Sequence, residues 1–249
     1  MIDDDSVLTR AAGAPAMSVV YGPEAEQVSD IRFGKREGQR RPLIVLIHGG
    51  FWRPAYDRTH LGPMSDALAS AGWTVATMEY RRVPGKPDLT LEDVTRAVEA
   101  LPALVGDHNG KVILIGHSAG GHLALWAGAT SRGPSVAGVV ALAPAADLQL
   151  AQQRNLGDGA VQAFLGEAAR ARRDVDPKLL PSPRIPVTIV HGELDDSVPL
   201  EVSQSYVATH PATRLVRLPG TGHFAVIDPL SPVWATVVAE VANLTSQVV

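Results

Sequence analysis

The chain has 249 residues, of which 45% are hydrophobic, and a formal net charge of −4 with acidic and basic residues both scattered along it. This length and apolar content suffice for a sizeable core, and α/β folds of this size are commonly single domains, so residues 1–249 are expected to form one domain. The scattered charges argue against a nucleic-acid partner, and the absence of cysteine excludes disulfides, thiolate metal sites and a cysteine nucleophile.

The first residues, Met1-Ile2-Asp3-Asp4-Asp5, are acidic where a secretory signal would be basic, and no apolar region follows them. No segment reaches the uninterrupted apolar length of a membrane helix. We therefore expect a cytoplasmic protein without a membrane partner. Residues 1–17 as a whole are expected to be a loosely held lead-in.

The rest of the chain alternates between short apolar runs and amphipathic stretches. Helices are predicted at residues 59–71, 91–105, 200–209 and 233–244, and after the turn near residue 118 as far as about residue 130. Such alternation predicts an α/β fold, with a mostly parallel sheet and helices on both faces. The runs predicted to be strands are residues 18–21, 27–33, 43–47, 73–78, 112–115, 136–142, 187–190 and 214–218.

Residues 147–184 break this rhythm with glycine, aspartate, several arginines and prolines, and they include a short helix predicted around residues 160–172. Inserts of this kind after a sheet strand often cover a site. Two interpretations remain open, a small cap over the site or a surface excursion without contact to substrate.

The pentapeptide Gly116-His117-Ser118-Ala119-Gly120 lies between a predicted buried strand and a predicted helix. A Gly-x-Ser-x-Gly turn in this context is typical of a nucleophile elbow, in which the serine occupies a strained turn and stands clear of the sheet. Neighbours two positions away must be small, or they would collide with the adjoining strand and helix. The helix N-terminus favours negative charge at the site. Ser118 is therefore predicted to be a nucleophile.

A serine hydroxyl needs a base with a pKa near 7, and the imidazole in turn needs a carboxylate to fix its tautomer. The order expected for this architecture is serine, acid, histidine, each after a strand. Asp195 follows the strand predicted at 187–190, and His223 follows the strand at 214–218. Asp196, the next residue, is the alternative for the acid, and we prefer Asp195.

The remaining histidines have simpler interpretations. His191 and His48 are each expected to hold a loop. His60, His108, His117, His122 and His210 are expected to be core, helix-face or loop residues, and no pair of them has a convincing metal-ligand spacing with a carboxylate. No metal or other cofactor is predicted.

The segment His48-Gly49-Gly50-Phe51-Trp52 follows the strand predicted at 43–47, and its glycines allow backbone amides to face a ligand. In such a site the residue after the nucleophile supplies one oxyanion donor and this loop the other. The predicted donors are the N–H of Ala119 and the N–H of Gly50 or Phe51. Phe51, Trp52 and Tyr56 are candidates for an acyl or aryl pocket, and packing within the loop is an equally good interpretation of them.

These motifs together resemble those of the α/β-hydrolase fold over roughly residues 18–245. The resemblance implies an eight-stranded, mostly parallel sheet and cleavage of acyl bonds without a cofactor. His48-Gly49-Gly50-Phe51-Trp52 resembles the HGGxW motif of the kynurenine formamidase-like and small carboxylesterase group, and Glu79-Tyr80-Arg81 is similar to its DYR stretch, with Glu in place of Asp.

The sequence therefore predicts a serine hydrolase that cleaves a carboxylic ester or (form)amide bond of a small-molecule acyl substrate. Arylformamidase activity is the narrower alternative. An acyltransferase, or a ligand-binding homologue without activity, is the further alternative.

Overall fold

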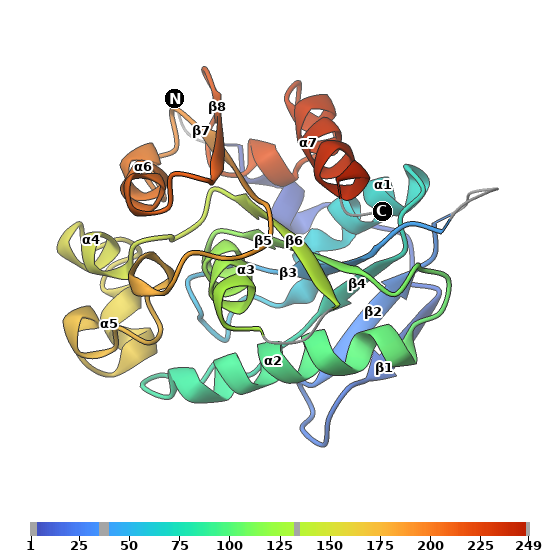
Figure 1. Cartoon of the computed structure of the whole chain (residues 1–249), viewed down its shortest axis with the longest axis horizontal. Helices are drawn as coiled ribbons and strands as arrows, with labels where there is room; N and C mark the ends of the chain where they lie inside the picture. The colour runs from blue at the N-terminus through green and yellow to red at the C-terminus, as the bar shows by residue number, and fades with distance from the viewer. Residues whose placement is uncertain (1–3, 35–39, 132–134, 248–249) are drawn as a thin grey trace.

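A sheet of eight strands, in the order β1-β2-β4-β3-β5-β6-β7-β8, forms the centre of the described structure (Figure 1). The computed structural model describes residues 4–34, 40–131 and 135–247. β2 pairs antiparallel with both β1 and β4, and every other neighbouring pair is parallel. The strands are β1 (Met17–Val20), β2 (Val28–Arg32), β3 (Leu43–Ile47), β4 (Val75–Met78), β5 (Val112–His117), β6 (Val136–Leu142), β7 (Val187–Gly192) and β8 (Arg214–Leu218).

The central strands are buried along their whole length, because helices cover both faces of the sheet. One face packs against α2 (Pro87–Leu104), α3 (Ala119–Thr130) and α6 (Leu200–Thr209). The other packs against α1 (Gly62–Ser70) and α7 (Trp234–Ser246), which Figure 1 shows on the side of the sheet opposite α2. The predicted α/β-hydrolase architecture is thereby confirmed.

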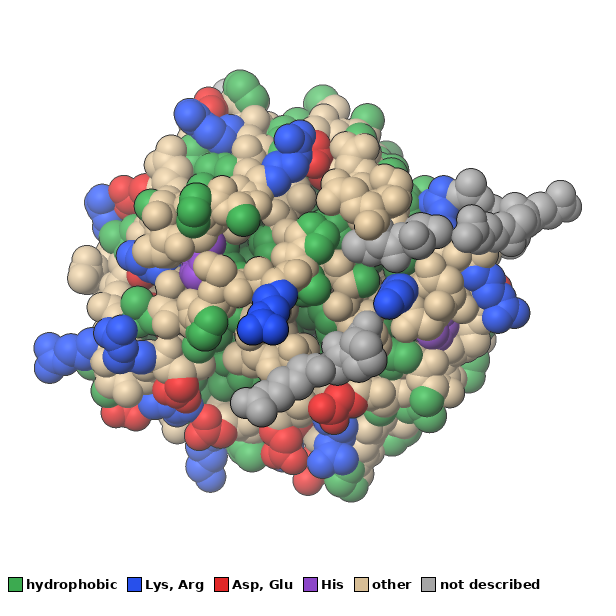
Figure 2. Space-filling view, in the orientation of Figure 1, with side chains coloured by type: hydrophobic (Ala, Val, Ile, Leu, Met, Phe, Trp, Pro, Cys, Tyr) green, Lys and Arg blue, Asp and Glu red, His purple; other side chains and the backbone are tan. Residues whose placement is uncertain are grey.

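Surface charge and helix length add two observations. On the face shown in Figure 2, basic and acidic side chains are interspersed. None of the helices within the described ranges combines the length and the apolar character that crossing a membrane requires.

Several element boundaries differ from those predicted. The helix predicted at 91–105 begins at Pro87, because proline fits the first turn of a helix, where no intrahelical acceptor is needed. The helix predicted at 59–71 is preceded by a 3₁₀ turn, η2 (Arg58–Leu61), with Asp57 as its N-cap. Strands β3, β6 and β8 and helix α6 have the predicted bounds.

The expectation of a loosely held lead-in is wrong for its described part, residues 4–17, and residues 1–3 lie outside the described residues. Residues Ser6–Thr9 form the 3₁₀ helix η1, and its Val7 side chain is 1% exposed and packs into the core. Arg10 forms an ion pair with Asp228, and the amide of Gly13 donates to Asp66 Oδ2 at 2.7 Å. This segment is therefore fixed to the rest of the fold.

Within residues 147–184 the chain forms α4 (Leu148–Gln153), which was not predicted, α5 (Ala160–Leu165), and the 3₁₀ helices η3 (Ala169–Ala171) and η4 (Pro177–Leu179). The helix predicted at 160–172 ends at Leu165, since Gly166 adopts a left-handed conformation with φ 75°.

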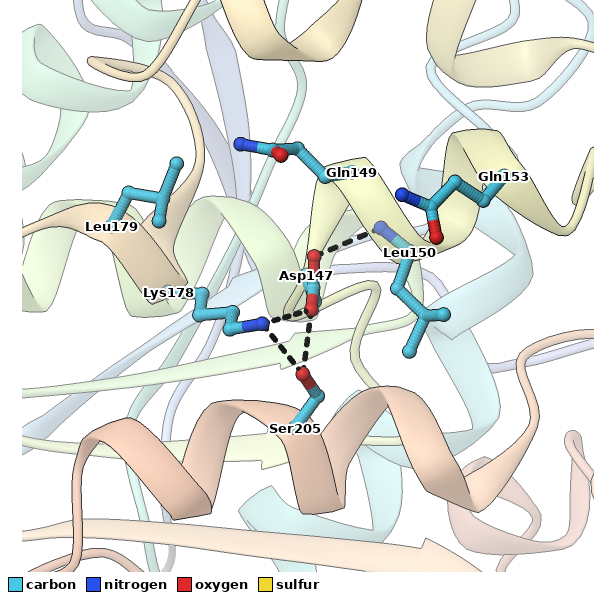
Figure 3. Close-up of a pocket in the computed structure, with 7 residues that line it drawn as sticks. All are labelled: Asp147, Gln149, Leu150, Gln153, Lys178, Leu179 and Ser205. Atoms are coloured by element: carbon cyan, nitrogen blue, oxygen red, sulfur yellow. Dashed lines mark hydrogen bonds and ion pairs between the residues drawn. The ribbon is translucent and has the colours of Figure 1, made fainter.

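A polar contact ties this insert to α6, beside a cavity of about 210 Å³ (Figure 3). Asp147 Oδ2 accepts hydrogen bonds from Lys178 Nζ at 2.7 Å and from Ser205 Oγ at 2.6 Å, while Oδ1 caps α4 through the Leu150 amide. Burial raises the pKa of the Asp147 carboxyl, but these hydrogen bonds and the Lys178 charge outweigh it and hold the pKa below its usual value.

The turn between β5 and α3 depends on two glycines that lie against backbone. A Cβ at Gly116 would lie 2.0 Å from the carbonyl oxygen of Gly120, and a Cβ at Gly120 would lie 2.1 Å from the carbonyl oxygen of Ile47. Neither clash can be relieved by turning a side chain, because the obstacle is backbone. The small residues of the Gly-x-Ser-x-Gly pattern thus let the helix lie against the end of β3.

We expect Gly120→Ala to lower the free energy of unfolding by at least about 3 kcal/mol or to prevent folding, because the added methyl overlaps a main-chain oxygen. Urea denaturation would measure this. The matched control is Gly106→Ala, at a position where a Cβ meets no atom within 4 Å. Equal stabilities of the two variants would contradict the proposed close contact.

Candidate active site

Ser118 occupies the turn at the end of β5 with φ 56° and ψ −117°, outside the regions that a side-chain-bearing residue prefers. Such strain costs about 1–3 kcal/mol and persists only where neighbouring contacts hold it. Here the Ser118 amide donates to the Leu142 carbonyl at the end of β6 (2.9 Å), and its carbonyl accepts from the Ala145 amide (3.2 Å). The sheet therefore fixes the turn that displays the serine.

His223 and Asp195 come from the loops after β8 and β7, and their side chains are hydrogen-bonded, with His223 Nδ1 2.7 Å from Asp195 Oδ2. A carboxylate only accepts, so Nδ1 carries the proton and Nε2 is the basic nitrogen. Asp195 Oδ1 accepts from the amides of Ser197 (3.0 Å) and Val198 (2.7 Å). The neighbouring Asp196 is exposed, so Asp195 is the carboxylate that orients His223.

A second histidine supports the same carboxylate. His191 Nε2 lies 3.2 Å from Asp195 Oδ2 and 2.8 Å from the Val198 carbonyl, while Nδ1 lies 2.7 Å from Ser203 Oγ. Burial raises the pKa of Asp195, but hydrogen bonds with His191 and His223 outweigh it and keep that pKa well below the usual value. Asp195 is therefore ionised at neutral pH. The geometry agrees with the loop-holding role predicted for His191.

Ser118 and His223 line one small cavity, of about 50 Å³. Its walls come from the ends of β3, β5, β7 and β8, where parallel strands direct their loops to one edge of the sheet. His60 lies further along the connection after β3, on η2, and Leu8 precedes every strand in the chain. The lining residues are Leu8, Gly50, Phe51, Tyr56, His60, His117, Ser118, Ser197, His223 and Phe224.

The loop after β3 places its backbone beside the serine. A Cβ at Gly49 would lie 3.0 Å from Ser118 Cβ. Gly50, Phe51 and Trp52 all have positive φ, at 105°, 52° and 55°. Ala119 is the first residue of α3, so its amide lies where helix amides have no intrahelical acceptor. The predicted oxyanion donors thus lie on the two backbone segments that flank Ser118.

The three aromatic candidates for an acyl or aryl pocket lie in different places, and Phe51 lines the cavity. Tyr56 lines the cavity, 39% exposed. Trp52 is 4% exposed and is not among the lining residues. Its ring stacks on Phe164 of α5 at 4.6 Å and meets His122 edge-on at 5.2 Å. For Trp52, the structure therefore favours the second interpretation left open by the sequence, packing within the loop and against α5.

The insert touches the loop but not the cavity, since no residue of 147–184 is among those lining it. Arg53 donates to the Gly157 carbonyl, and a Cβ at Gly157 would lie 2.7 Å from Phe51 Cδ1. Together with the Trp52–Phe164 stack, these contacts support the loop after β3 from outside.

Five lining residues were not predicted to be at the site, namely Leu8, His60, His117, Ser197 and Phe224. Burial, with a smaller contribution from the nearby His48, lowers the pKa of His60 to about 4, so this histidine is neutral at physiological pH. No local motif marks Leu8, His60 or Ser197, whereas His117 and Phe224 directly adjoin the predicted Ser118 and His223. Across the described ranges, no group of three or more His, Asp or Glu side chains is arranged to hold a metal ion.

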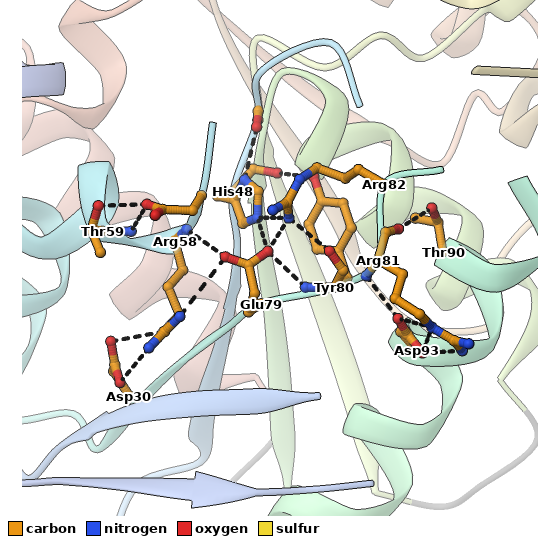
Figure 4. Close-up of polar contacts among 12 residues, drawn as sticks. Asp30, His48, Arg58, Thr59, Glu79, Tyr80, Arg81, Arg82, Thr90 and Asp93 are labelled. Atoms are coloured by element: carbon orange, nitrogen blue, oxygen red, sulfur yellow. Dashed lines mark hydrogen bonds and ion pairs between the residues drawn. The ribbon is translucent and has the colours of Figure 1, made fainter. Parts of the chain in front are cut away.

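A buried ionic network underlies the loop after β3 (Figure 4). Glu79 Oε1 lies 2.9 Å from His48 Nε2, accepts from the Tyr80 amide at 2.8 Å and pairs with Arg82, while Oε2 accepts from the Arg58 amide at 3.0 Å. The Tyr80 hydroxyl donates to the His48 carbonyl at 2.8 Å. His48 is thus held at its side chain and its backbone, at the first residue of the loop.

The electrostatics of this network favour the charged carboxylate. Burial raises the pKa of Glu79, but the hydrogen bond with His48 and the charges of His48 and Arg82 outweigh it and lower the pKa to about 2. The Glu79 side chain thereby contacts the loop after β3, the first residue of η2 and the chain after β4.

The sheet order and the placement of Ser118, Asp195 and His223 at its carboxyl edge define an α/β-hydrolase. More particularly, residues 29–209 match the family model BD-FAE, and the chain belongs to this family. Esterase LipC from Mycobacterium tuberculosis is 25% identical over 242 residues, which span 84% of this chain and 60% of the relative. Kynurenine formamidase from Drosophila melanogaster is 28% identical over 121 residues, spanning 47% of this chain and 39% of the relative.

Among solved structures, esterase B from Lactobacillus rhamnosis has a TM-score of 0.78 and 20% identity, with 98% of this chain and 90% of that chain covered. At this identity the likeness shows the fold. The chain spans about 60% or less of the length of the curated relatives LipC, LipQ and kynurenine formamidase.

We expect Glu79→Gln to lower the free energy of unfolding at pH 7 by about 3 kcal/mol, because it leaves the charge of Arg82 without its buried partner. The pKa of Glu79 is lowered on folding, from 4.5 to about 2, so its contribution is complete above pH 4.5 and is lost as the pH falls towards 2. The stability difference between wild type and Glu79→Gln should therefore shrink over this range, as urea denaturation at several pH values would show.

The control is Glu92→Gln. Glu92 pairs with Arg81 and Arg96 but its side chain is 52% exposed, so its loss should change stability by no more than about 0.5 kcal/mol. A stability difference for Glu79→Gln that does not vary with pH would argue against an ionised Glu79 in the folded protein.

Proposed function

We propose that this protein is a serine hydrolase that cleaves carboxylic esters of small molecules, with Ser118 as nucleophile, His223 as general base and Asp195 as the residue that orients it. The observation that carries the proposal is the 2.7 Å hydrogen bond between His223 Nδ1 and Asp195 Oδ2, at a cavity that His223 shares with the strained Ser118. Family membership and relatives named as esterases support it.

In the proposed reaction, Ser118 Oγ attacks the substrate carbonyl carbon while its proton passes to His223 Nε2. Asp195 stabilises the imidazolium that forms. The carbonyl oxygen becomes an oxyanion and accepts hydrogen bonds from the amides of Ala119 and of Gly50 or Phe51, each worth on the order of 3 kcal/mol of barrier.

The second half of the reaction releases the acyl group. The tetrahedral intermediate collapses, the alcohol leaves with the proton from His223, and an acyl-enzyme remains on Ser118. A water molecule then gives a proton to His223 as it attacks the acyl carbon. Collapse of this second intermediate releases the carboxylic acid and returns the proton to Ser118.

Arylformamidase activity is a second candidate. The cavity of about 50 Å³ suits a small acyl group, of which formyl is the smallest, and relatives named kynurenine formamidase align with part of this chain. Comparing kcat/KM for N-formylkynurenine with that for p-nitrophenyl acetate would test it. A preference for the formamide would select this activity, and a preference for the acetate would select the esterase.

For the triad, we expect Ser118→Ala to abolish hydrolysis of p-nitrophenyl acetate, and Asp195→Asn to lower kcat by about 10³- to 10⁴-fold, since an amide no longer fixes the His223 tautomer. Steady-state kinetics on folded variants would measure both.

Asp196→Asn is the matched control, because this neighbouring carboxylate is exposed, and it should change kcat by no more than about twofold. Turnover retained in Ser118→Ala, or equal losses in the two aspartate variants, would contradict the proposed triad. Acyl transfer to an added alcohol that outruns hydrolysis would indicate a transferase instead.

A further inference from the structure

The wall of the cavity at Ser118 includes one residue from a segment that precedes the whole sheet. Leu8 lies on η1, and every other lining residue follows or ends β3, β5, β7 or β8. Leu8 is partly buried and packs against the same core cluster as Phe224, which also lines the cavity. A residue remote from every catalytic motif therefore limits the space beside the proposed nucleophile.

The position of Leu8 is fixed by its neighbours. Val7, the preceding residue, is 1% exposed and belongs to the core cluster that contains Leu61, Val226 and Ile227. η1 packs directly against η2, the 3₁₀ turn that supplies His60 to the cavity. Val7 thus anchors η1 in the core while the adjacent Leu8 meets the cavity.

An ion pair ties the same segment to the loop that carries His223. Arg10 pairs with Asp228, with Nη2 3.0 Å from Oδ2, and Arg10 Nη2 also lies 3.2 Å from Ser6 Oγ. Asp228 directly follows η5 (Ala225–Ile227), the short helix after His223 and Phe224. The ion pair therefore fixes the position of Leu8 relative to the loop that carries the proposed general base, His223.

The size of the cavity limits what it can hold. At about 50 Å³, where a single water needs roughly 10–15 Å³, the space beside Ser118 is small. The leaving alcohol must depart before water attacks, whereas the acyl group stays on the serine. A small cavity beside the serine therefore suits the acyl part of the substrate.

We propose that Leu8 sets the upper limit on the length of the acyl chain that the cavity at Ser118 accepts, so that the substrates are esters of short acyl groups. This inference rests on the proposed function. The size of the Leu8 side chain, held by Val7 and Arg10, determines where the acyl chain must end.

The test is the ratio of kcat/KM for p-nitrophenyl hexanoate to that for the acetate, in wild type and in Leu8 variants. One methylene in an apolar pocket changes specificity by about tenfold or more. Leu8→Ala should raise the ratio at least about tenfold, because it removes most of the side chain from the wall. Leu8→Phe should lower the ratio of butyrate to acetate by a similar factor.

Leu230→Ala is the control, since Leu230 is 76% exposed and does not line the cavity, and both ratios should be unchanged. If Leu8→Ala does not fold, Leu8→Val makes a smaller change at the same point and should raise the hexanoate ratio less.

The outcomes separate the two proposals. Ratios that stay within twofold of wild type in the folded Leu8 variants, while turnover depends on Ser118, would overturn only the role of Leu8. Turnover of the esters that survives in Ser118→Ala, or is absent from the wild type, would overturn the proposed function and this inference with it.

Discussion

The contact between the first turn of α3 and the end of β3 determines how the site is assembled. Gly120 lies so close to the Ile47 carbonyl that a Cβ would come within 2.1 Å of it. Because β3 and β5 are parallel neighbours in register, with Ile47 opposite Gly116, the loop after β3 starts beside the turn that carries Ser118. The proposed nucleophile and the proposed oxyanion donors are thus brought together by one backbone contact, which only glycine permits.

Two buried carboxylates stabilise this arrangement from opposite sides. Glu79 pairs with His48 and Arg82 beneath the loop after β3, and Asp195 pairs with His191 and His223 at the other edge of the site. A buried carboxylate without such partners would cost several kcal/mol and would take up a proton instead. Each charge is therefore retained only while its partners keep their positions, which couples the ionic networks to the geometry of the loops.

The sequence allowed the sheet and the proposed triad to be predicted, because both follow from local signals. The central strands are continuous apolar runs; Ser118 directly follows β5, and Asp195 and His223 lie in the loops after β7 and β8. Leu8 and His60 could not be placed at the site, since their contacts join segments far apart in the chain and no periodic pattern accompanies them. Trp52 stands in a motif, but the motif did not tell whether its ring lines the pocket or packs in the core. Its positive φ of 55° is not visible in the sequence.

The insert at residues 147–184 packs against the loop after β3 and contributes no residue to the lining of the cavity. Phe51 and Trp52 hold left-handed conformations that cost about 1–3 kcal/mol each, and both rings lie against the insert, at Gly157 and Phe164. Packing of these aromatic rings offsets the strain. The insert thus supports the loop after β3, while the wall of the cavity includes Leu8 and Tyr56 and no residue of the insert. The insert therefore reaches the cavity only through the loop after β3, whose Gly50 and Phe51 line it, whereas Leu8 belongs to a separate segment of the wall.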